Sequence, residues 1–204
     1  MSIIVIRHGE TALNAARILQ PPGTPLSELG IAQARALAPR IAALGIAAII
    51  CSDLPRALMT AAPLAELTGL PIERTDLLQE RNFGDLRGLP FDSLDYNPIA
   101  TDDAPPGGES SAVFNERVAR AFAFVTAMRA RVGGPLAVVT HGLVVRSILE
   151  RHAKAGAGIA LPERLSNTSV SVLAPQSPWE ILLANCTAHL DEAIRDDGRG
   201  VSGI

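Results

Sequence analysis

The first predicted strand, and the residues that directly follow it, constrain this chain most. Residues 3–6 (IIVI) form a short apolar run rich in β-branched side chains, which predicts a buried β-strand. The run ends abruptly at Arg7 and His8, where a strand gives way to a loop. Ligands of open α/β sheets bind just beyond the carboxyl ends of strands, and Gly9 lets the backbone approach a ligand closely. The alternative for an isolated Arg-His pair is a solvated strand end.

Strand and helix signals alternate along the chain and predict an α/β sheet. Ser27 is a suitable N-cap for a helix that begins directly after it. Pro39 lies within this helix and predicts a kink or a break. Residues 47–51 predict a second buried strand, and residues 165–170 and 179–183 predict two later strands that pair antiparallel. Because strands that alternate with helices pair in parallel, we expect a sheet with parallel strands. The apolar stripe of the helix is Ala34, Leu37, Ile41 and Leu44.

Two further strand ends carry polar residues. After the second strand, Asp53 is placed to cap a helix whose first turn contains Arg56. An arginine there opposes the helix dipole, which a bound anion would explain. Residues 136–139 predict another strand, which ends at His141 and Gly142, beside a helix N-terminus suited to anions. An ordinary surface arginine and a structural histidine are the alternatives.

Three loops are candidates for lining a site. Residues 21–23 (PPG) lie in a proline-rich loop that could form one lip of a pocket. Residues 77–88 hold a carboxylate, Glu80, among two arginines and two glycines; a surface glutamate paired with a nearby arginine is the alternative. Residues 89–108 are rich in Pro, Asp and Gly and predict a long loop or lid with one helical turn, a kind of loop that is often functional.

Length and composition predict a globular chain of one domain, or at most two small ones. The chain has 204 residues, 48% of them hydrophobic, and a net charge of −3, which argues against nucleic acid or an anionic membrane as the main partner. Cys51 and Cys186 are expected to be reduced thiols. No secretory leader is visible, and the longest apolar run is shorter than a membrane span, so we expect a cytoplasmic protein. Residues 191–204 predict a flexible tail, and a homodimer stays open as an oligomeric state.

Four motifs resemble the signatures of the histidine phosphatase superfamily, the phosphoglycerate-mutase-like enzymes. They are R-H-G-E-T-x-x-N from Arg7, S-D-L-x-R-A-x-x-T-A from Ser52, L-x-E-x-x-F-G-x-x-x-G from Leu78, and the T-H-G that follows residue 139. They occur in the family's order, and the resemblance covers residues 1–190. It implies a three-layer α/β/α sandwich with a mostly parallel sheet, formed as a single domain by residues 1–190.

The resemblance also implies a role for each matching residue. His8 is the residue that becomes phosphorylated, with its tautomer fixed by a backbone carbonyl. Glu80 is the proton donor, so we predict a raised pKa for its carboxyl. Two arginines and a histidinium would offset the phosphoryl charge, because the planar guanidinium binds two oxygens at once. No metal or other cofactor is expected. The residues implied to bind the phosphoryl group are Arg7, Asn14, Arg56, His141 and Gly142.

The motifs favour a phosphatase over a mutase. Mutases of the family resemble R-H-G-x-S-x-W-N, whereas this chain has Thr11 and Leu13 in place of the Ser and the Trp. Residues 89–108 also lack the Trp-Arg-Arg segment of the mutases. We therefore expect a phosphatase whose partner is a small phosphorylated metabolite. A mutase, and a module that binds or dephosphorylates phosphoproteins, are the alternatives; the Gly-rich motifs of serine hydrolases and dinucleotide-binding folds are absent from the sequence.

Overall fold

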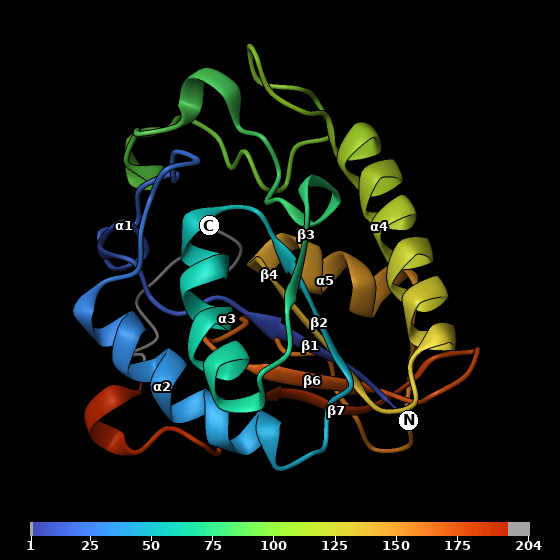
Figure 1. Cartoon of the computed structure of the whole chain (residues 1–204). Helices are drawn as coiled ribbons and strands as arrows, with labels where there is room; N and C mark the ends of the chain where they lie inside the picture. Colours follow the sequence, from blue (N-terminus) through green and yellow to red (C-terminus); the bar gives the residue numbers. More distant parts are fainter. Residues whose placement is uncertain (1, 196–204) are drawn as a thin grey trace.

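A seven-stranded, mostly parallel sheet forms the centre of the computed structural model, which describes residues 2–195 (Figure 1). The strand order is β3-β2-β4-β1-β6-β7-β5. The strands β1, β2, β3 and β4 pair in parallel, whereas β6 pairs antiparallel with both β1 and β7. The strands are β1 (Ile3–Arg7), β2 (Ala48–Ser52), β3 (Ile72–Thr75), β4 (Leu136–Thr140), β5 (Lys154–Ala155), β6 (Val170–Leu173) and β7 (Glu180–Cys186).

Helices cover both faces of this sheet. In Figure 1, α2 (Glu28–Ala42) and α3 (Pro55–Thr68) lie on one side of it, and α4 (Ser111–Arg131) and α5 (Gly142–Arg151) lie on the other. A short helix, α1 (Ala12–Ala15), follows β1. Single 3-10 turns lie at Asp76–Leu78, Gly84–Leu86, Phe91–Ser93 and Glu192–Ile194. The structure thus confirms the predicted α/β/α sandwich.

The side chains of β1 show why the sheet needs two covering layers. Ile4 and Ile6 pack into the core on the side of α2 and α3, whereas Ile3 and Val5 pack into the core on the side of α4 and α5. Successive side chains of a strand point to opposite faces. A strand that is apolar at every position is therefore buried from both sides, as the strands of parallel sheets are. The predicted strand thus lies at the centre of the sheet.

Of the kink or break expected at Pro39, the structure excludes the break, and the helix cap expected at Asp53 is wrong. Pro39 does not break the helix: α2 continues through it to Ala42, and Pro39 lies on the exposed side, where water can reach the carbonyl that loses its partner. Asp53 does not cap α3. The N-cap residue is Leu54, which makes no side-chain cap, while the Asp53 carboxylate accepts a hydrogen bond of 2.7 Å from the Gln79 side chain.

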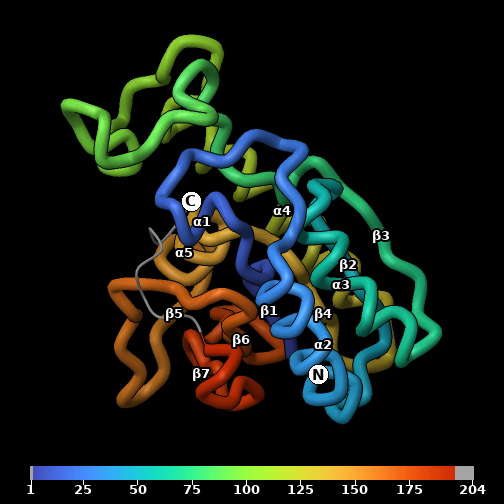
Figure 2. The backbone as a smooth tube through the Cα atoms, turned by 90° about the vertical axis from the view of Figure 1, so that its left-hand side faces the viewer, coloured from blue at the N-terminus to red at the C-terminus, as the bar shows by residue number. Residues whose placement is uncertain are grey.

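The loop of residues 89–108 extends away from the body of the molecule above the carboxyl ends of the parallel strands (Figure 2). It contains the one helical turn that was expected, Phe91–Ser93. Arg81 holds its base, because its guanidinium donates to the carbonyls of Pro98, Thr101 and Asp103. The loop of residues 89–108 is therefore hydrogen-bonded to the segment that carries Glu80.

The predicted tail lies mostly outside the described residues, which end at Arg195. Of its first residues, Ile194 accepts a hydrogen bond of 3.1 Å from the Gln33 side chain through its carbonyl. The later strands are antiparallel, as predicted, but β6 begins only at Val170, and residues 166–169 form a turn instead. Within residues 2–195, no helix combines the length and apolar character needed to cross a membrane.

Candidate active site

The candidate site lies where β1, β2 and β4 end side by side. The pairing places Arg7 opposite Thr140, so His8 and His141 follow neighbouring strands at the same level. Their ring centroids are 5.1 Å apart, and both side chains are buried. Ser52, the last residue of β2, lies on the other side of His141, with its hydroxyl 2.8 Å from Nε2. The strand ends that the sequence singled out thus meet in one place.

The His8 ring is held in one orientation and in one tautomer. Its Nδ1 lies 2.7 Å from the carbonyl oxygen of Gly9. Because a carbonyl only accepts hydrogen bonds, Nδ1 carries the proton and Nε2 keeps its lone pair. Burial and the charges of Arg56 and Arg7 lower the pKa of His8 well below its ordinary value of 6.5. The imidazole is therefore neutral at pH 7, with Nε2 available as a nucleophile.

A buried guanidinium with two unsatisfied nitrogens is the clearest sign of an anion site. Arg56 lies in the first turn of α3 and is 2% exposed. Its Nε and Nη1 atoms find no hydrogen-bond partner within residues 2–195. Burial lowers its pKa to about 10, helped by the charges of Arg87 and Arg7 and opposed by Glu80, so Arg56 stays charged at pH 7. Burying such a cation is costly, and an anionic ligand would remove that cost.

His141 differs from its expected state. Burial and the charge of Arg56 lower its pKa well below 6.5, so the ring is neutral rather than a histidinium. A histidinium was expected beside the two arginines, but burial disfavours the charged ring and the arginines oppose a third cation. The Nδ1 atom of His141 is buried without a hydrogen-bond partner among the described residues. It is thus available to bond a ligand.

Glu80 is fixed by two backbone groups. Its Oε1 accepts from the N–H of Arg81 at 2.9 Å, and its Oε2 accepts from the N–H of Leu143, at the start of α5, at 3.1 Å. Burial raises the pKa of Glu80 above its ordinary value of 4.5, although these N–H groups and the charges of Arg56 and Arg7 act in the opposite direction. The predicted upward shift is confirmed, and its main cause is burial.

Arg117, from α4, supports the loop that presents Glu80. Its guanidinium donates to the carbonyls of Leu77, Gln79 and Glu80 and forms an ion pair of 2.8 Å with Glu109. Because one guanidinium donates to three carbonyls of the loop, the position of Glu80 beside the strand ends is fixed without regular secondary structure. Sequence reasoning missed this support, since Arg117 lies 37 residues beyond Glu80.

A small pocket opens beside these groups. Pro22, from the PPG loop that the sequence suggested as a lip, is among the residues that line it. Gln20 places an amide nitrogen in a buried position without a partner among residues 2–195, while its oxygen is bonded to Thr11. Arg87 adds a third guanidinium to the lining. The remaining lining residues are Leu54, Arg56, Glu80, Arg81 and Phe83.

A buried polar turn behind β1 was not recognised as part of the site. Residues 166–169, which we call the clamp turn, hold the backbone of His8: the Asn167 amide donates to the His8 carbonyl at 3.1 Å, and the N–H of Thr168 does so at 3.2 Å. Asn167 also reaches Asn14, which places that predicted ligand beside the turn. The run of polar residues directly before β6 was the available signal, but it was taken for part of the strand.

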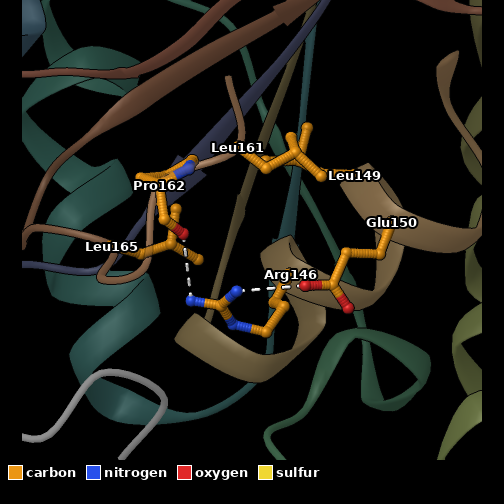
Figure 3. A pocket seen from close by; sticks show the side chains of 6 residues that line it. All are labelled: Arg146, Leu149, Glu150, Leu161, Pro162 and Leu165. Carbon is orange, nitrogen blue, oxygen red and sulfur yellow. Dashed lines mark hydrogen bonds and ion pairs between the residues drawn. The ribbon is translucent and has the colours of Figure 1, made fainter. Parts of the chain in front are cut away.

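The segment before the clamp turn is tied to α5. Figure 3 shows Arg146 between Glu150 and the chain at Pro162, to which its guanidinium donates, and Glu163 accepts a second bond of 2.6 Å. Leu165, on the same segment, accepts a hydrogen bond from the Arg7 guanidinium. The carbonyl of Leu165 therefore fixes the guanidinium of Arg7. Gly142, the first residue of α5, follows His141 directly.

Comparisons with known proteins agree with this geometry. A sequence model of the histidine phosphatase superfamily (branch 1) matches residues 3–187. The chain is 33% identical over 213 residues to the probable phosphoglycerate mutase GpmB of Yersinia pestis (strain Pestoides F), with 97% of this chain and 98% of that protein covered.

Solved structures of both activities share the fold. A mycobacterial glucosyl-3-phosphoglycerate phosphatase in complex with VO3 has a TM-score of 0.75 and 28% identity, with 91% of this chain and 99% of that chain covered. A phosphoglycerate mutase from Thermus thermophilus has a TM-score of 0.68 and 32% identity, with 94% and 100% covered. The strand-end histidines, the buried arginine and these matches lead to one conclusion: the chain is an enzyme that belongs to the histidine phosphatase superfamily (branch 1).

Proposed function

We propose that this enzyme hydrolyses a small phosphomonoester without a metal ion, through a phosphohistidine formed on His8. The observation that carries the proposal is the buried guanidinium of Arg56, with two unsatisfied nitrogens, near a neutral His8 whose Nε2 keeps its lone pair. The positive charges of Arg56 and Arg7 would stabilise a phosphoryl group placed there, and Nδ1 of His141 would donate a hydrogen bond to one of its oxygens. These groups supply the electrostatic stabilisation that a metal ion supplies in other phosphoryl-transfer enzymes.

The two half-reactions follow from the positions of His8 and Glu80. In the first, His8 Nε2 forms a bond to phosphorus as the phosphorus–oxygen bond of the ester breaks, and the protonated Glu80 gives its proton to the leaving oxygen. In the second, Glu80 takes a proton from water as the water oxygen attacks phosphorus. The nitrogen–phosphorus bond then breaks, inorganic phosphate leaves, and both residues return to their starting states.

The sequence supports hydrolysis rather than isomerisation. Thr11 and Leu13 stand where the pattern of the family's mutases has Ser and Trp, and residues 89–108 contain no Trp-Arg-Arg segment. The proteins with similar sequence or structure include a phosphatase and mutases, so resemblance alone favours neither. A mutase must keep its intermediate close to the phosphohistidine and return the phosphoryl group to it, whereas a phosphatase only needs to admit water.

A panel of phosphomonoesters, assayed in the presence of EDTA, tests the proposed function. The panel includes 3-phosphoglycerate, 2,3-bisphosphoglycerate, a sugar phosphate and p-nitrophenyl phosphate, and both released phosphate and isomerised product are measured. We expect phosphate release that EDTA does not reduce. Isomerised product without phosphate would establish a mutase, and binding of vanadate without turnover of any ester would favour the phosphoprotein alternative.

Arg56→Ala is expected to weaken the binding of inorganic phosphate or vanadate by about 10- to 100-fold, the range set by losing one charge-assisted bidentate contact of roughly 1.5–3 kcal/mol. Titration calorimetry measures the dissociation constant directly. The matched control is Arg35→Ala, which removes an exposed arginine from α2. Equal affinities of the Arg56 variant and the wild type would place Arg56 outside the phosphate site.

The pH dependence of kcat/KM reports the protonation of Glu80. The first step needs Glu80 protonated and His8 neutral, and the pKa shifts, upward for Glu80 and downward for His8, favour both states. We therefore expect kcat/KM for an alkyl phosphate to fall as the pH rises through the raised pKa of Glu80. Glu80→Gln, which cannot ionise, should lack this limb; a limb that persists in the variant would have to come from another group.

A further inference from the structure

The clamp turn contains a strained residue at the point where it meets the nucleophile. Thr168 has a φ of 52°, which is unusual for any residue with a side chain and an outlier for a β-branched one. Its N–H donates to the carbonyl oxygen of His8, and its side chain is fully buried. Such a conformation persists only when surrounding groups hold it in place.

A chain of hydrogen bonds reaches Thr168 from the other side. The hydroxyl oxygen of Thr168 lies 3.1 Å from Nε2 of His189, and Nδ1 of His189 lies 3.0 Å from a guanidinium nitrogen of Arg40. Arg40 stands in the last turn of α2 and also donates to the carbonyl and the sulfur of Cys186, at 3.3 Å and 3.1 Å. The chain of contacts thus runs from a helix, past the end of β7, to the nucleophile.

The direction of each bond follows from the chemistry of the groups. Arginine has no acceptor, so Arg40 donates and Nδ1 of His189 accepts. Burial and the charge of Arg40 lower the pKa of His189 to about 4, so the ring is neutral at pH 7 and its proton is on Nε2. The Nε2–H group of His189 therefore donates a hydrogen bond to the hydroxyl oxygen of Thr168. The imidazole of His189 therefore accepts a hydrogen bond from Arg40 and donates one to Thr168.

We propose that His189 is a positioning residue: together with Arg40 it holds Thr168 in the left-handed conformation, and so keeps the backbone of His8 in place for attack on phosphorus. His189 touches neither the pocket lining nor the His8 ring in the contacts above, so its effect passes through Thr168. The inference rests on the proposed role of His8 as the nucleophile. A displacement of about 1 Å in a reacting group is enough to cost on the order of 100-fold in rate.

A rescue experiment separates positioning from general support of the fold. His189→Ala is expected to lower kcat for p-nitrophenyl phosphate by about 10- to 100-fold while KM changes by less than about threefold. Glycine adopts a positive φ without strain. Thr168→Gly should therefore make His189 dispensable, and the double variant Thr168→Gly/His189→Ala should recover kcat to within about threefold of Thr168→Gly alone.

Two further variants complete the test. Arg40→Met leaves His189 in place but removes its donor, and should reduce kcat in the same direction; it carries the test if His189→Ala does not fold. His152→Ala is the matched control, because that histidine stacks on Phe122, away from the clamp turn, and its kcat should equal that of the wild type. Folding is followed by circular dichroism and thermal denaturation.

The outcomes distinguish this inference from the proposed function. A folded His189→Ala with wild-type kcat, or a loss of kcat that glycine at position 168 does not relieve, would overturn the positioning role while the enzyme remains a phosphatase. A wild-type enzyme that hydrolyses no phosphomonoester would instead overturn the proposed function, and the positioning role would fall with it.

Discussion

His8→Ala is expected to reduce phosphate release by a factor on the order of 10⁴ or more, because the variant has no atom that can form the phosphoenzyme. The side chain is bonded to its own loop, and its backbone bonds to β4 and the clamp turn do not depend on the imidazole, so its removal leaves the strand end in place. Phosphate or vanadate should still bind, since the arginines remain. The measurement combines steady-state phosphate release with rapid quench at high pH, where phosphohistidine is stable and can be trapped.

The control for this prediction is again His152→Ala, which removes an imidazole of the same size outside the site. It should retain both turnover and a trapped phosphoenzyme. A His8→Ala enzyme that turned over at the wild-type rate, or that still gave a labelled phosphoenzyme of the same stability, would show that another residue is the nucleophile. Loss of turnover together with loss of vanadate binding would point instead to a collapsed site.

Glu80→Gln should have the second largest effect, and its size should depend on the leaving group. An alkoxide needs a proton as it departs, so we expect kcat/KM for an alkyl phosphate to fall by roughly 10²–10⁴-fold, the usual contribution of a general acid. The p-nitrophenolate ion leaves without a proton, so kcat/KM for p-nitrophenyl phosphate should fall by less than about tenfold. Glutamine is close to glutamate in size, and its oxygen can keep one of the two backbone bonds.

The same variant should also reveal the second half-reaction. Without a base to take the proton of water, the phosphohistidine should accumulate, and p-nitrophenol should appear in a burst of about one equivalent per site. Glu150→Gln is the matched control, because Glu150 forms a surface pair with Arg146. Equal losses of kcat/KM for the two substrates would show that Glu80 is not the proton donor.

The parts of the fold that sequence reasoning predicted depend on local patterns. The β1 run is apolar from residue 3 to residue 6, which specifies a central strand, and Ser27 caps α2 with its own side chain, within three residues of the N–H it bonds. The residues at the strand ends were predictable for the same reason: each lies directly after a recognisable strand. A parallel sheet then brings them together without further information.

The parts that were missed depend on distant partners or on exposure. The Asp53 carboxylate accepts a hydrogen bond from the Gln79 side chain rather than from the first turn of α3, and no residue near Asp53 in the sequence indicates this partner. Pro39 is tolerated because it lies on the exposed side of α2. The exposure of one position within a helix cannot be predicted reliably from the sequence. The lowered pKa of His141 comes first from burial and then from the charge of Arg56, which the fold brings against it. The clamp turn contacts the end of β1 from more than 150 residues away, so only the folded chain shows its role.

The central place of β1 has a consequence for how the protein acquires activity during synthesis. This strand is made before the strands with which it pairs, because β4 and β6 follow more than 130 and more than 160 residues later. Contacts of such long range form late and slowly. The proposed nucleophile, His8, is thus translated well before the strands that set it in place. A nascent chain that ends before residue 170 should be inert however well its helices have formed.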